Sequence, residues 1–381
     1  MVNYNDEKSK CGDYMDDSKY IQRALELAKL GVGNVNPNPL VGAVIVKDDV
    51  VIGEGYHQKY GEPHAEINAF SSLTESATGA TLYVTLEPCS HFGKTPPCVD
   101  SVISAGIARV VVGSLDPNPL VAGRSITKMR EAGIDVEIGV LQAECDALNA
   151  VFFHYITTKT PYVIMKYAMT ADGKIATKTG ASRWITGVVA RNRVHEDRHR
   201  YSGIMVGVGT VLADDPMLDC RLEHGKNPTR IICDSMLRTP VSSRIMETAT
   251  QIPTVILTTS VNTERHKSYL EKGCKIVSIP SKNGRLDLEI GLQLLGEMGI
   301  DSILLEGGAT LNASMLEAGL VQKVQTYLAP KIFGGITAPT PVAGLGVESP
   351  DHAYQLINTK TTILGADILI ESEVDYSCSQ V

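Results

Sequence analysis

The sequence predicts an α/β protein made of two domains. Short β-branched runs typical of strands alternate with amphipathic helical patterns, and this alternation indicates a parallel or mixed sheet with helices on its faces. The chain has 381 residues, whereas most domains contain about 100 to 200. The polar stretch Thr157–Pro161 is the expected junction, because Pro161 opens a new strand. We therefore expect domains at 18–158 and 159–381.

The first domain is expected to begin with a helix. Ser18 can cap this helix, and Gly31 is placed to end it. A turn-rich loop, Asn34–Pro39, leads to a strand and a hairpin. The elements expected from there are strands at 40–46 and 50–55, a helix at 64–73, a strand at 80–86, a helix at 99–105, a strand at 109–113 and a helix near 142–153.

The second domain is expected to have the same layered organisation. Helical patterns fit between several of its apolar runs. The expected strands lie at 162–168, 204–207, 230–233, 254–258, 275–279 and 302–305.

The composition is that of a globular protein that acts on a small molecule. Apolar residues make up 43% of the chain and charged residues 20%, which argues against disorder. The longest apolar runs, such as Val41–Val46, fall far short of the roughly 20 residues needed to cross a bilayer, so we expect no membrane span. A formal net charge of −8 argues against nucleic acid, whose partners usually carry a basic surface.

The first 17 residues are interpreted as a flexible tail. They carry five acidic residues and no apolar core, which excludes a secretory signal. Eight cysteines without an export signal fit a reducing compartment, so we expect a cytoplasmic protein.

One His and two Cys residues form a candidate zinc site. His64 opens a predicted helix, Cys89 follows a predicted strand, and Cys98 precedes the next helix. One imidazole and two thiolates suit tetrahedral zinc and leave one position for water, as in catalytic sites. Glu66 diverges from His64 on a regular helix, and approaches the same metal only at the first turn. From there it is placed to carry a proton to a leaving amine.

Each of these residues alone has a more ordinary explanation. A single His at a helix start is usually a surface or core residue, and buried free Cys behaves as a small hydrophobe. Their combination, His-x-Glu followed by Pro-Cys and a second Cys, is the signature of zinc nucleobase deaminases. The usual two residues between the cysteines are eight here, Ser90–Pro97, which leaves His91 as a rival ligand.

Three stretches carry a closer resemblance: Val35–Gly42 (VNPNPLVG), Gly53–Glu66 (GEGYHQKYGEPHAE) and Thr85–Cys98 (TLEPCSHFGKTPPC). Together they resemble the deaminase half of the bifunctional riboflavin-biosynthesis deaminase/reductase family, over about residues 18–150. The resemblance implies a cytidine-deaminase-like α/β/α domain with zinc. The residues that it implies are the zinc ligands His64, Cys89 and Cys98, the proton shuttle Glu66, the pyrimidine contacts Asn38 and His57, and the ribose-phosphate contact Lys94.

Two glycine clusters mark the second domain. Gly307–Thr310 and Val206–Thr210 each follow a predicted strand, where backbone N–H groups can approach a phosphate. Alone this signal is weak, because a glycine pair after a strand is more often a tight turn.

The second half resembles the reductase half of the same family, a domain built like dihydrofolate reductase, over about residues 161–370. The matching stretches are Lys166–Thr177, Ser182–Gly187, Val206–Asp214 and Leu305–Asn312. The resemblance implies an NADPH site formed by Met169, Trp184, Thr186, Thr210, Asp214, Gly308, Ala309, Thr310, Leu311 and Asn312. It implies a sugar-phosphate site formed by Lys166, Ser182, Arg198, Leu218, Arg221 and Glu306. Without it, the arginines are most simply surface charges and Trp184 a core residue.

We therefore expect a cytoplasmic bifunctional enzyme that deaminates a phosphoribosylated aminopyrimidine with zinc and then reduces its ribose with NADPH. A homo-oligomer, dimer or tetramer, is expected. The alternatives are a tRNA or free-base deaminase with an appended domain, and a structural zinc module fused to a nucleotide sensor. The reductase-like half argues against the first alternative, and Glu66 beside an open three-ligand site argues against the second.

Overall fold

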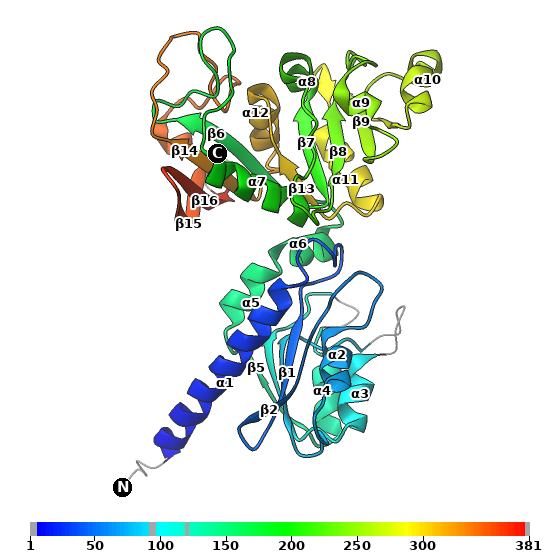
Figure 1. The fold of residues 1–381 in the computed structure, drawn as a ribbon, viewed down its shortest axis with the longest axis vertical. Coiled ribbons are helices and arrows are strands. Elements are labelled where there is room, and N and C mark those ends of the chain that lie inside the picture. The colour runs from blue at the N-terminus through cyan, green and yellow to red at the C-terminus, as the bar shows by residue number, and fades with distance from the viewer. Residues whose placement is uncertain (1–5, 91–96, 119–121, 378–381) are drawn as a thin grey trace. The chain divides into compact units, whose positions relative to one another are not determined.

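The computed structural model describes residues 6–90, 97–118 and 122–377, without the side chains of 6–16. The chain divides into two compact units, Met1–Thr158 and Lys159–Val381 (Figure 1). Both units are α/β structures, as the sequence predicts. In the described part of the chain, no helix combines the length and the apolar character that a membrane crossing requires.

A five-stranded mixed sheet forms the centre of the first unit. Its order is β2-β1-β3-β4-β5. The strands are β1 (Gly42–Lys47), β2 (Val50–Tyr56), β3 (Thr81–Leu86), β4 (Arg109–Ser114) and β5 (Asp135–Ile138). β1 runs antiparallel to β2 and β3, whereas β3, β4 and β5 are parallel. The parallel strands therefore bring their carboxyl ends to one edge of the sheet.

Helices cover both faces of this sheet. They are α1 (Asp6–Lys29), α2 (Ala65–Ser71), α3 (Cys98–Ser104), α4 (Arg124–Glu131) and α5 (Gln142–Leu148), and α6 (Ala150–Thr158) ends the unit without a buried residue of its own. Side chains of β1 alternate between the faces: Val44 and Val46 pack with α1, and Ala43 and Ile45 with α2, α3 and α4. The expected α/β/α layering is confirmed.

The start of the first unit differs from the expectation. The helix predicted from Ser18 begins at Asp6, so residues 6–17 are helical. Asp17 is 2% exposed, and it accepts hydrogen bonds from the Arg109 guanidinium at 2.8 and 2.8 Å and from the Tyr83 hydroxyl at 2.8 Å. One of the five acidic residues in the first 17 is thus buried in an ion pair, and the composition of this segment alone does not reveal that pair.

A buried side chain also interrupts the helix expected near 142–153. Asn149 separates α5 from α6. Its side-chain amide accepts from the Leu40 N–H at 2.8 Å and donates to the Leu40 carbonyl at 3.0 Å. The break therefore supplies partners for the backbone just before β1.

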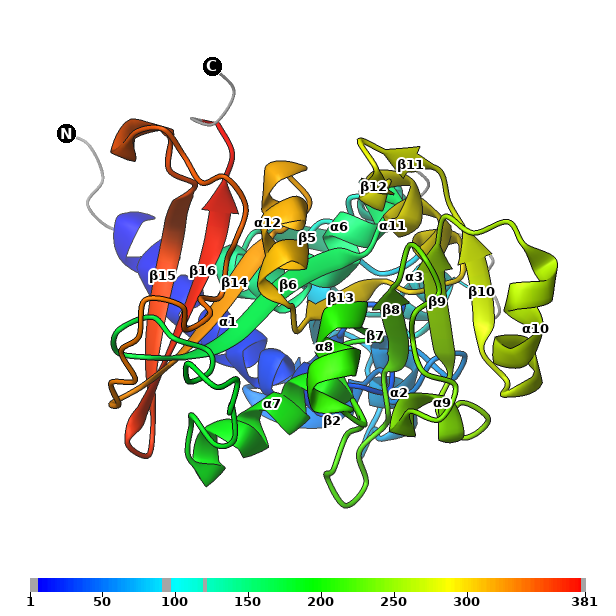
Figure 2. The ribbon, with the colours of Figure 1, turned by 90° about the horizontal axis from the view of Figure 1, so that it is seen from above.

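The second unit is built on a nine-stranded sheet of order β10-β9-β8-β7-β13-β6-β14-β16-β15. Figure 2 shows these strands side by side. The strands are β6 (Tyr162–Thr170), β7 (Gly203–Gly207), β8 (Thr229–Cys233), β9 (Thr254–Thr258), β10 (Lys275–Ser278), β13 (Ser302–Leu305), β14 (Lys323–Ala329), β15 (Gln355–Leu364) and β16 (Asp367–Asp375). The first seven strands in this order, from β10 to β14, pair in parallel. The last two, β16 and β15, are added by antiparallel pairing.

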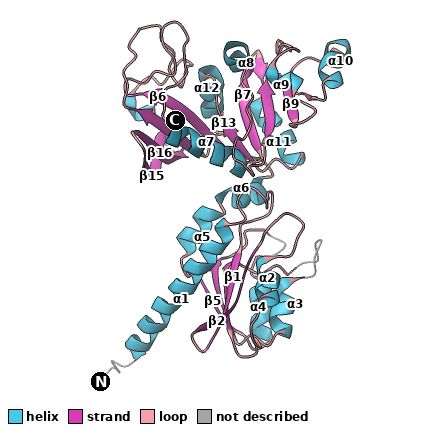
Figure 3. Ribbon diagram, viewed as in Figure 1, coloured by secondary structure: helices cyan, strands magenta, loops and turns pink. Residues whose placement is uncertain are grey.

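The remaining elements of this unit are short (Figure 3). They are α7 (Val188–Arg200), α8 (Val208–Asp214), α9 (Arg244–Glu247), α10 (Thr263–Glu271), α11 (Leu288–Glu297), α12 (Ala309–Glu317), the 3₁₀ turn η1 (Pro350–His352) and a hairpin of β11 (Ser281–Lys282) and β12 (Arg285–Leu286). All six predicted strands are present, but β14, β15, β16 and the two hairpin strands β11 and β12 were not predicted. β15 is exposed along almost its whole length, so it lacks the apolar pattern of a core strand.

Removal of the Asp17 carboxylate should destabilise the first unit. We expect Asp17→Ala to lower the free energy of unfolding by about 1.5–3 kcal/mol, because Arg109 and Tyr83 lose a buried acceptor. Urea unfolding of the variant measures this loss. Glu75→Ala is the matched control, since its exposed pair with Lys47 should contribute less than about 1 kcal/mol. Equal losses in the two variants would contradict the prediction.

Candidate active sites

The three expected metal ligands meet at one point of the first unit. His64 directly precedes α2, Cys89 lies beyond the end of β3, and Cys98 is the first residue of α3. His64 Nδ1 lies 3.5 Å from Cys89 Sγ and 3.3 Å from Cys98 Sγ, and the three ligand atoms are all within 4.8 Å of one another. One nitrogen and two sulfur donors at this separation fit a tetrahedral zinc ion with a fourth position for another ligand.

The two thiols titrate as a pair. The hydrogen bond from the Cys98 thiol, with that from His64, lowers the pKa of Cys89 to about 4 against the effect of burial. The same contact between the thiols, together with burial, raises the pKa of Cys98. A bound cation favours ionisation of both sulfurs, since thiolates are the metal-binding form.

Glu66 lies in the first turn of α2, beside these ligands. It is 3% exposed. Burial, and then the charge of Cys89, raise the pKa of its carboxyl to about 7. A carboxyl in this range can take up and release a proton near neutral pH, as a proton carrier must.

A cavity of about 280 Å³ opens beside the cluster and is lined by His64, Glu66 and Cys89. Both expected pyrimidine contacts, Asn38 and His57, line it as well. His57 Nδ1 lies 3.1 Å from the Pro63 carbonyl, and its Nε2 lies 3.1 Å from Asn38 Nδ2. Because the Pro63 carbonyl can only accept and the Asn38 amide nitrogen can only donate, these contacts fit a neutral ring protonated at Nδ1. Burial also lowers the pKa of His57.

Other lining residues were not found from the sequence. They are Glu87, Asp116, Asn118, Tyr60, Phe152 and Ile156, among others. Glu87 lies only two residues before Cys89, and this closeness to an expected zinc ligand was a signal that could have identified it from the sequence. Lys94 and the rival ligand His91 lie outside the described residues.

The second candidate site is a cavity of about 1370 Å³ in the second unit. Its walls include α8, which follows β7 directly, and the segments after β8 and β13, at the carboxyl edge of the parallel strands, where α/β folds bind their ligands. Seven of the expected residues line it: Ser182, Thr210, Asp214, Gly308, Ala309, Thr310 and Leu311.

The two glycine clusters meet in this cavity. The Gly207 N–H donates to the Gly307 carbonyl at 2.8 Å, and the Gly308 N–H donates to Thr210 Oγ1 at 3.2 Å. A Cβ added at Gly308 would lie 3.3 Å from Thr210 Oγ1. Glycine therefore lets the backbone at 308 lie close against Thr210, and a cavity of this size fits a dinucleotide such as NADPH.

Four expected cofactor residues do not line the cavity. Asn312 is buried beneath it and donates to the Pro341 carbonyl at 2.9 Å. Met169 lies near the end of β6, and Thr186 is buried. Trp184 is 58% exposed, with the Arg191 guanidinium 4.5 Å from its ring centroid, so the core position that its size would suggest is wrong.

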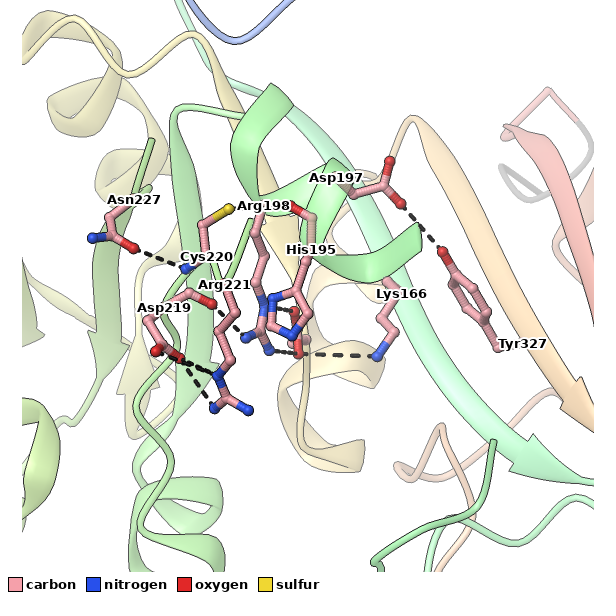
Figure 4. A network of polar contacts seen from close by, with 10 residues as sticks. Lys166, His195, Asp197, Arg198, Asp219, Cys220, Arg221, Asn227 and Tyr327 are labelled. Atoms are coloured by element: carbon pink, nitrogen blue, oxygen red, sulfur yellow. Dashed lines mark hydrogen bonds and ion pairs between the residues drawn. The ribbon is translucent and has the colours of Figure 1, made fainter. Parts of the chain in front are cut away.

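Three of the expected substrate residues form a buried ion cluster (Figure 4). Arg198 donates to both carboxylate oxygens of Glu306, at 2.8 and 2.9 Å, and Lys166 Nζ lies 3.9 Å from the same carboxylate. Burial opposes ionisation of Glu306, but the charges of Arg198 and Lys166 and the two hydrogen bonds lower its pKa to about 2. Burial lowers the pKa of Lys166 despite Glu306. The Glu306 carboxylate, with its lowered pKa, therefore stays charged across the physiological pH range.

The other expected substrate residues have different surroundings. The Arg221 side chain is 53% exposed and lies 3.1 Å from Asp219. Leu218 is buried, in the left-handed backbone region with φ of 52°. Figure 4 also shows a residue that the sequence analysis missed, His195, beside Arg198. Burial, and then the charges of Arg198 and Arg221, lower the pKa of His195.

Two domain families match the chain. Residues 15–114 match the cytidine and deoxycytidylate deaminase zinc-binding region, and residues 161–370 match the RibD C-terminal domain. The first match contains the zinc cluster, and the second contains the whole ion cluster.

Relatives match over nearly the full length. The riboflavin biosynthesis protein RibD of Actinobacillus pleuropneumoniae is 54% identical over 94% of this chain and 95% of its own, and that of Aquifex aeolicus is 43% identical over 93% and 97%. The solved structure of Acinetobacter baumannii RibD aligns with a TM-score of 0.84 at 36% identity, over 95% of this chain and 99% of that one. A Thermotoga maritima deaminase/reductase aligns with a TM-score of 0.83 at 39% identity, over 95% and 100%.

The geometry predicts which variants lose the metal. His64→Ala, Cys89→Ala and Cys98→Ala should each purify with little zinc, because each removes one of the three clustered donors. His91→Ala should keep its zinc. Metal analysis of the purified variants measures this. If His91→Ala loses zinc while Cys98→Ala keeps it, the ligand set is wrong.

Proposed function

The chain belongs to the RibD family of riboflavin biosynthesis, and we propose that the two cavities described above are its two active sites. The protein is a bifunctional enzyme, a zinc-dependent deaminase and an NADPH-dependent reductase. It deaminates 2,5-diamino-6-(5-phosphoribosylamino)pyrimidin-4(3H)-one and then reduces the ribosyl group to give 5-amino-6-(5-phosphoribitylamino)uracil. The observation that carries the site assignment is the cluster of one imidazole and two thiols, with a buried carboxyl beside it in a cavity.

In the deaminase, His64, Cys89 and Cys98 hold zinc, which when bound activates water for attack on the amino-bearing ring carbon. Glu66 takes the proton from the water and delivers it to the departing amine. Asn38 and His57 orient the pyrimidine, since the contacts of His57 with Asn38 and Pro63 fix the ring tautomer. Lys94 meets the ribose phosphate.

In the reductase, NADPH supplies the hydride when it is bound. Thr210 and the backbone of Gly308–Leu311 line the wall that we assign to the cofactor, together with Asp214. Met169, Trp184, Thr186 and Asn312 complete the proposed cofactor set. The proposed partner of the sugar-phosphate substrate is the ion cluster of Lys166, Arg198 and Glu306, with Ser182, Leu218 and Arg221.

We propose a homo-oligomer, a dimer or a tetramer, that works in the cytoplasm. The exposed edge strand β15 supports self-association, because its backbone has a free pairing edge and its Leu356, Ile357 and Ile363 side chains are 47%, 42% and 67% exposed. The described cysteines, at 89, 98, 145, 220, 233 and 274, form no disulfide, which suits a reducing compartment. Light scattering of the purified protein measures the oligomeric state.

A single assay tests the function. The purified protein is given the diaminopyrimidine ribotide with and without NADPH, and the products are identified by mass. Without NADPH we expect exchange of one amino group for oxygen. With NADPH we expect the further addition of two hydrogens. Release of ammonia without any reduction would limit the function to the first unit.

Glu66→Gln should separate metal binding from chemistry. The amide cannot carry a proton, so we expect zinc to be retained and deamination to fall at least about 100-fold. Zinc content and ammonia release measure the two effects. As a control, the same variant should reduce the deaminated ribotide at the wild-type rate. Substantial deamination by this variant would exclude the shuttle role.

Arg221→Ala should weaken binding of the ribotide and spare the cofactor. A phosphate dianion needs charge-assisted partners, and loss of one contact costs about 1.5–3 kcal/mol, or roughly 10 to 150-fold in affinity. We expect the reductase KM for the ribotide to rise by that factor, with the Kd of NADPH unchanged. A substrate without its phosphate should show no difference between variant and wild type. A weaker NADPH affinity with an unchanged ribotide KM would place Arg221 at the cofactor's phosphates.

A further inference from the structure

Glu87 is a buried carboxylate of the deaminase cavity for which the reaction described above has no role. It follows β3 directly and lies two residues before Cys89. It is 4% exposed and lines the cavity together with His64 and Glu66. Its backbone N–H donates to the carbonyl of Ser114, the last residue of β4, at 2.9 Å. Its backbone is therefore fixed between the two central parallel strands.

The Glu87 carboxylate gathers three hydrogen bonds from one connection of the chain. Oε1 accepts from the Ser125 hydroxyl at 2.7 Å. Oε2 accepts from the backbone N–H groups of Gly123 at 3.0 Å and Asp116 at 3.3 Å. No Lys, Arg or His of the described residues lies within ion-pair distance of it. Neutral donors thus supply the specific contacts of this buried acid.

These donors come from both ends of the connection between β4 and α4. Asp116 lies two residues after β4, and Gly123 and Ser125 lie at the start of α4. Asp116 in turn accepts from the Asn118 N–H at 2.8 Å. Asp116 and Asn118 both line the cavity. One carboxylate therefore ties the entry and exit of the connection together and, through Asp116, holds the backbone of Asn118.

We propose that Glu87 is a positioning residue that holds the wall formed by Asp116 and Asn118 in the shape that receives the pyrimidine ribotide. This inference rests on the proposed assignment of the cavity to deamination. A carboxylate suits the task because it offers only acceptors to three donors. Glu87 acts through this wall and not on the metal or on the proton that leaves with the amine.

Glu87→Ala and Glu87→Gln test the role. The Ala variant loses all three contacts, so its KM for the diaminopyrimidine ribotide should rise at least about tenfold, the equivalent of one lost charge-assisted hydrogen bond. Its kcat and its zinc content should stay close to the wild-type values. The Gln variant should recover most of the affinity, because its carbonyl can still accept from Gly123 and Asp116 while the Ser125 hydroxyl turns to accept from its amide.

Two further variants keep the test decisive. Ser125→Ala removes only the contact to Oε1 and leaves Glu87 in place, so it should raise the KM by a smaller factor; it decides the question if Glu87→Ala does not fold. Glu54→Gln is the matched control: this carboxylate of the same unit bonds Arg23 and does not line the cavity, so its kinetics should be those of the wild type.

Several results would overturn the proposal. One is an unchanged KM in Glu87→Ala, or in Ser125→Ala where Glu87→Ala does not fold. Others are a fall in the kcat of Glu87→Ala at constant KM and a loss of zinc from that variant. The last is a Glu87→Gln variant that is as impaired as Glu87→Ala. Failure of the proposed function is distinguishable, because the wild-type protein would then not deaminate the ribotide.

Discussion

A zinc site requires its ligand atoms to lie close together although they come from separate elements. In the first unit, the ligand atoms of His64, Cys89 and Cys98 all lie within 4.8 Å of one another. Two ligands lie at helix starts, His64 before α2 and Cys98 in α3, and the third, Cys89, follows β3. Parallel pairing of β3 with β4 places the strand ends at one edge, and α2 and α3 pack on the same face of the sheet. The site therefore depends on the packing of that face as much as on its ligands.

The second unit meets a different constraint, because it buries charges. Lys166 lies on β6, Arg198 on α7, and Glu306 directly after β13, which is paired with β6. Removing two cations and one anion from water is costly unless each charge has a partner. Glu306 supplies the partner for both cations, and the formal charges of the three side chains sum to one positive charge. A cluster of that sign favours an anionic ligand at the adjacent surface.

The sequence predicts those parts of the structure that depend on apolar runs and on residue types that are rare outside metal sites. The strands that contain continuous apolar runs, such as β8 and β9, and the His64, Cys89 and Cys98 cluster belong to these. It does not predict β15, which lies at the sheet edge and is exposed along almost its whole length, or the partner of Asp17, which is 92 residues away at Arg109. Lining residues such as Asn118 depend on chain folding, since nothing in their neighbouring sequence distinguishes them from loop residues.

Three buried glutamates show how surroundings decide what one side chain does. Glu306 faces two cations, which lower its pKa to about 2, so it serves as a permanent charge. Glu66 is buried, and the charge of Cys89 acts on it in the same direction as burial, so its pKa rises to about 7 and it suits proton transfer. Glu87 is held by two backbone N–H groups and a hydroxyl, so its acceptors are occupied by the chain itself. Burial, the neighbouring charges and the donors that reach each carboxyl, more than the residue type, therefore separate an ion-pair partner, a carboxyl suited to proton transfer and a carboxylate bonded by the chain itself.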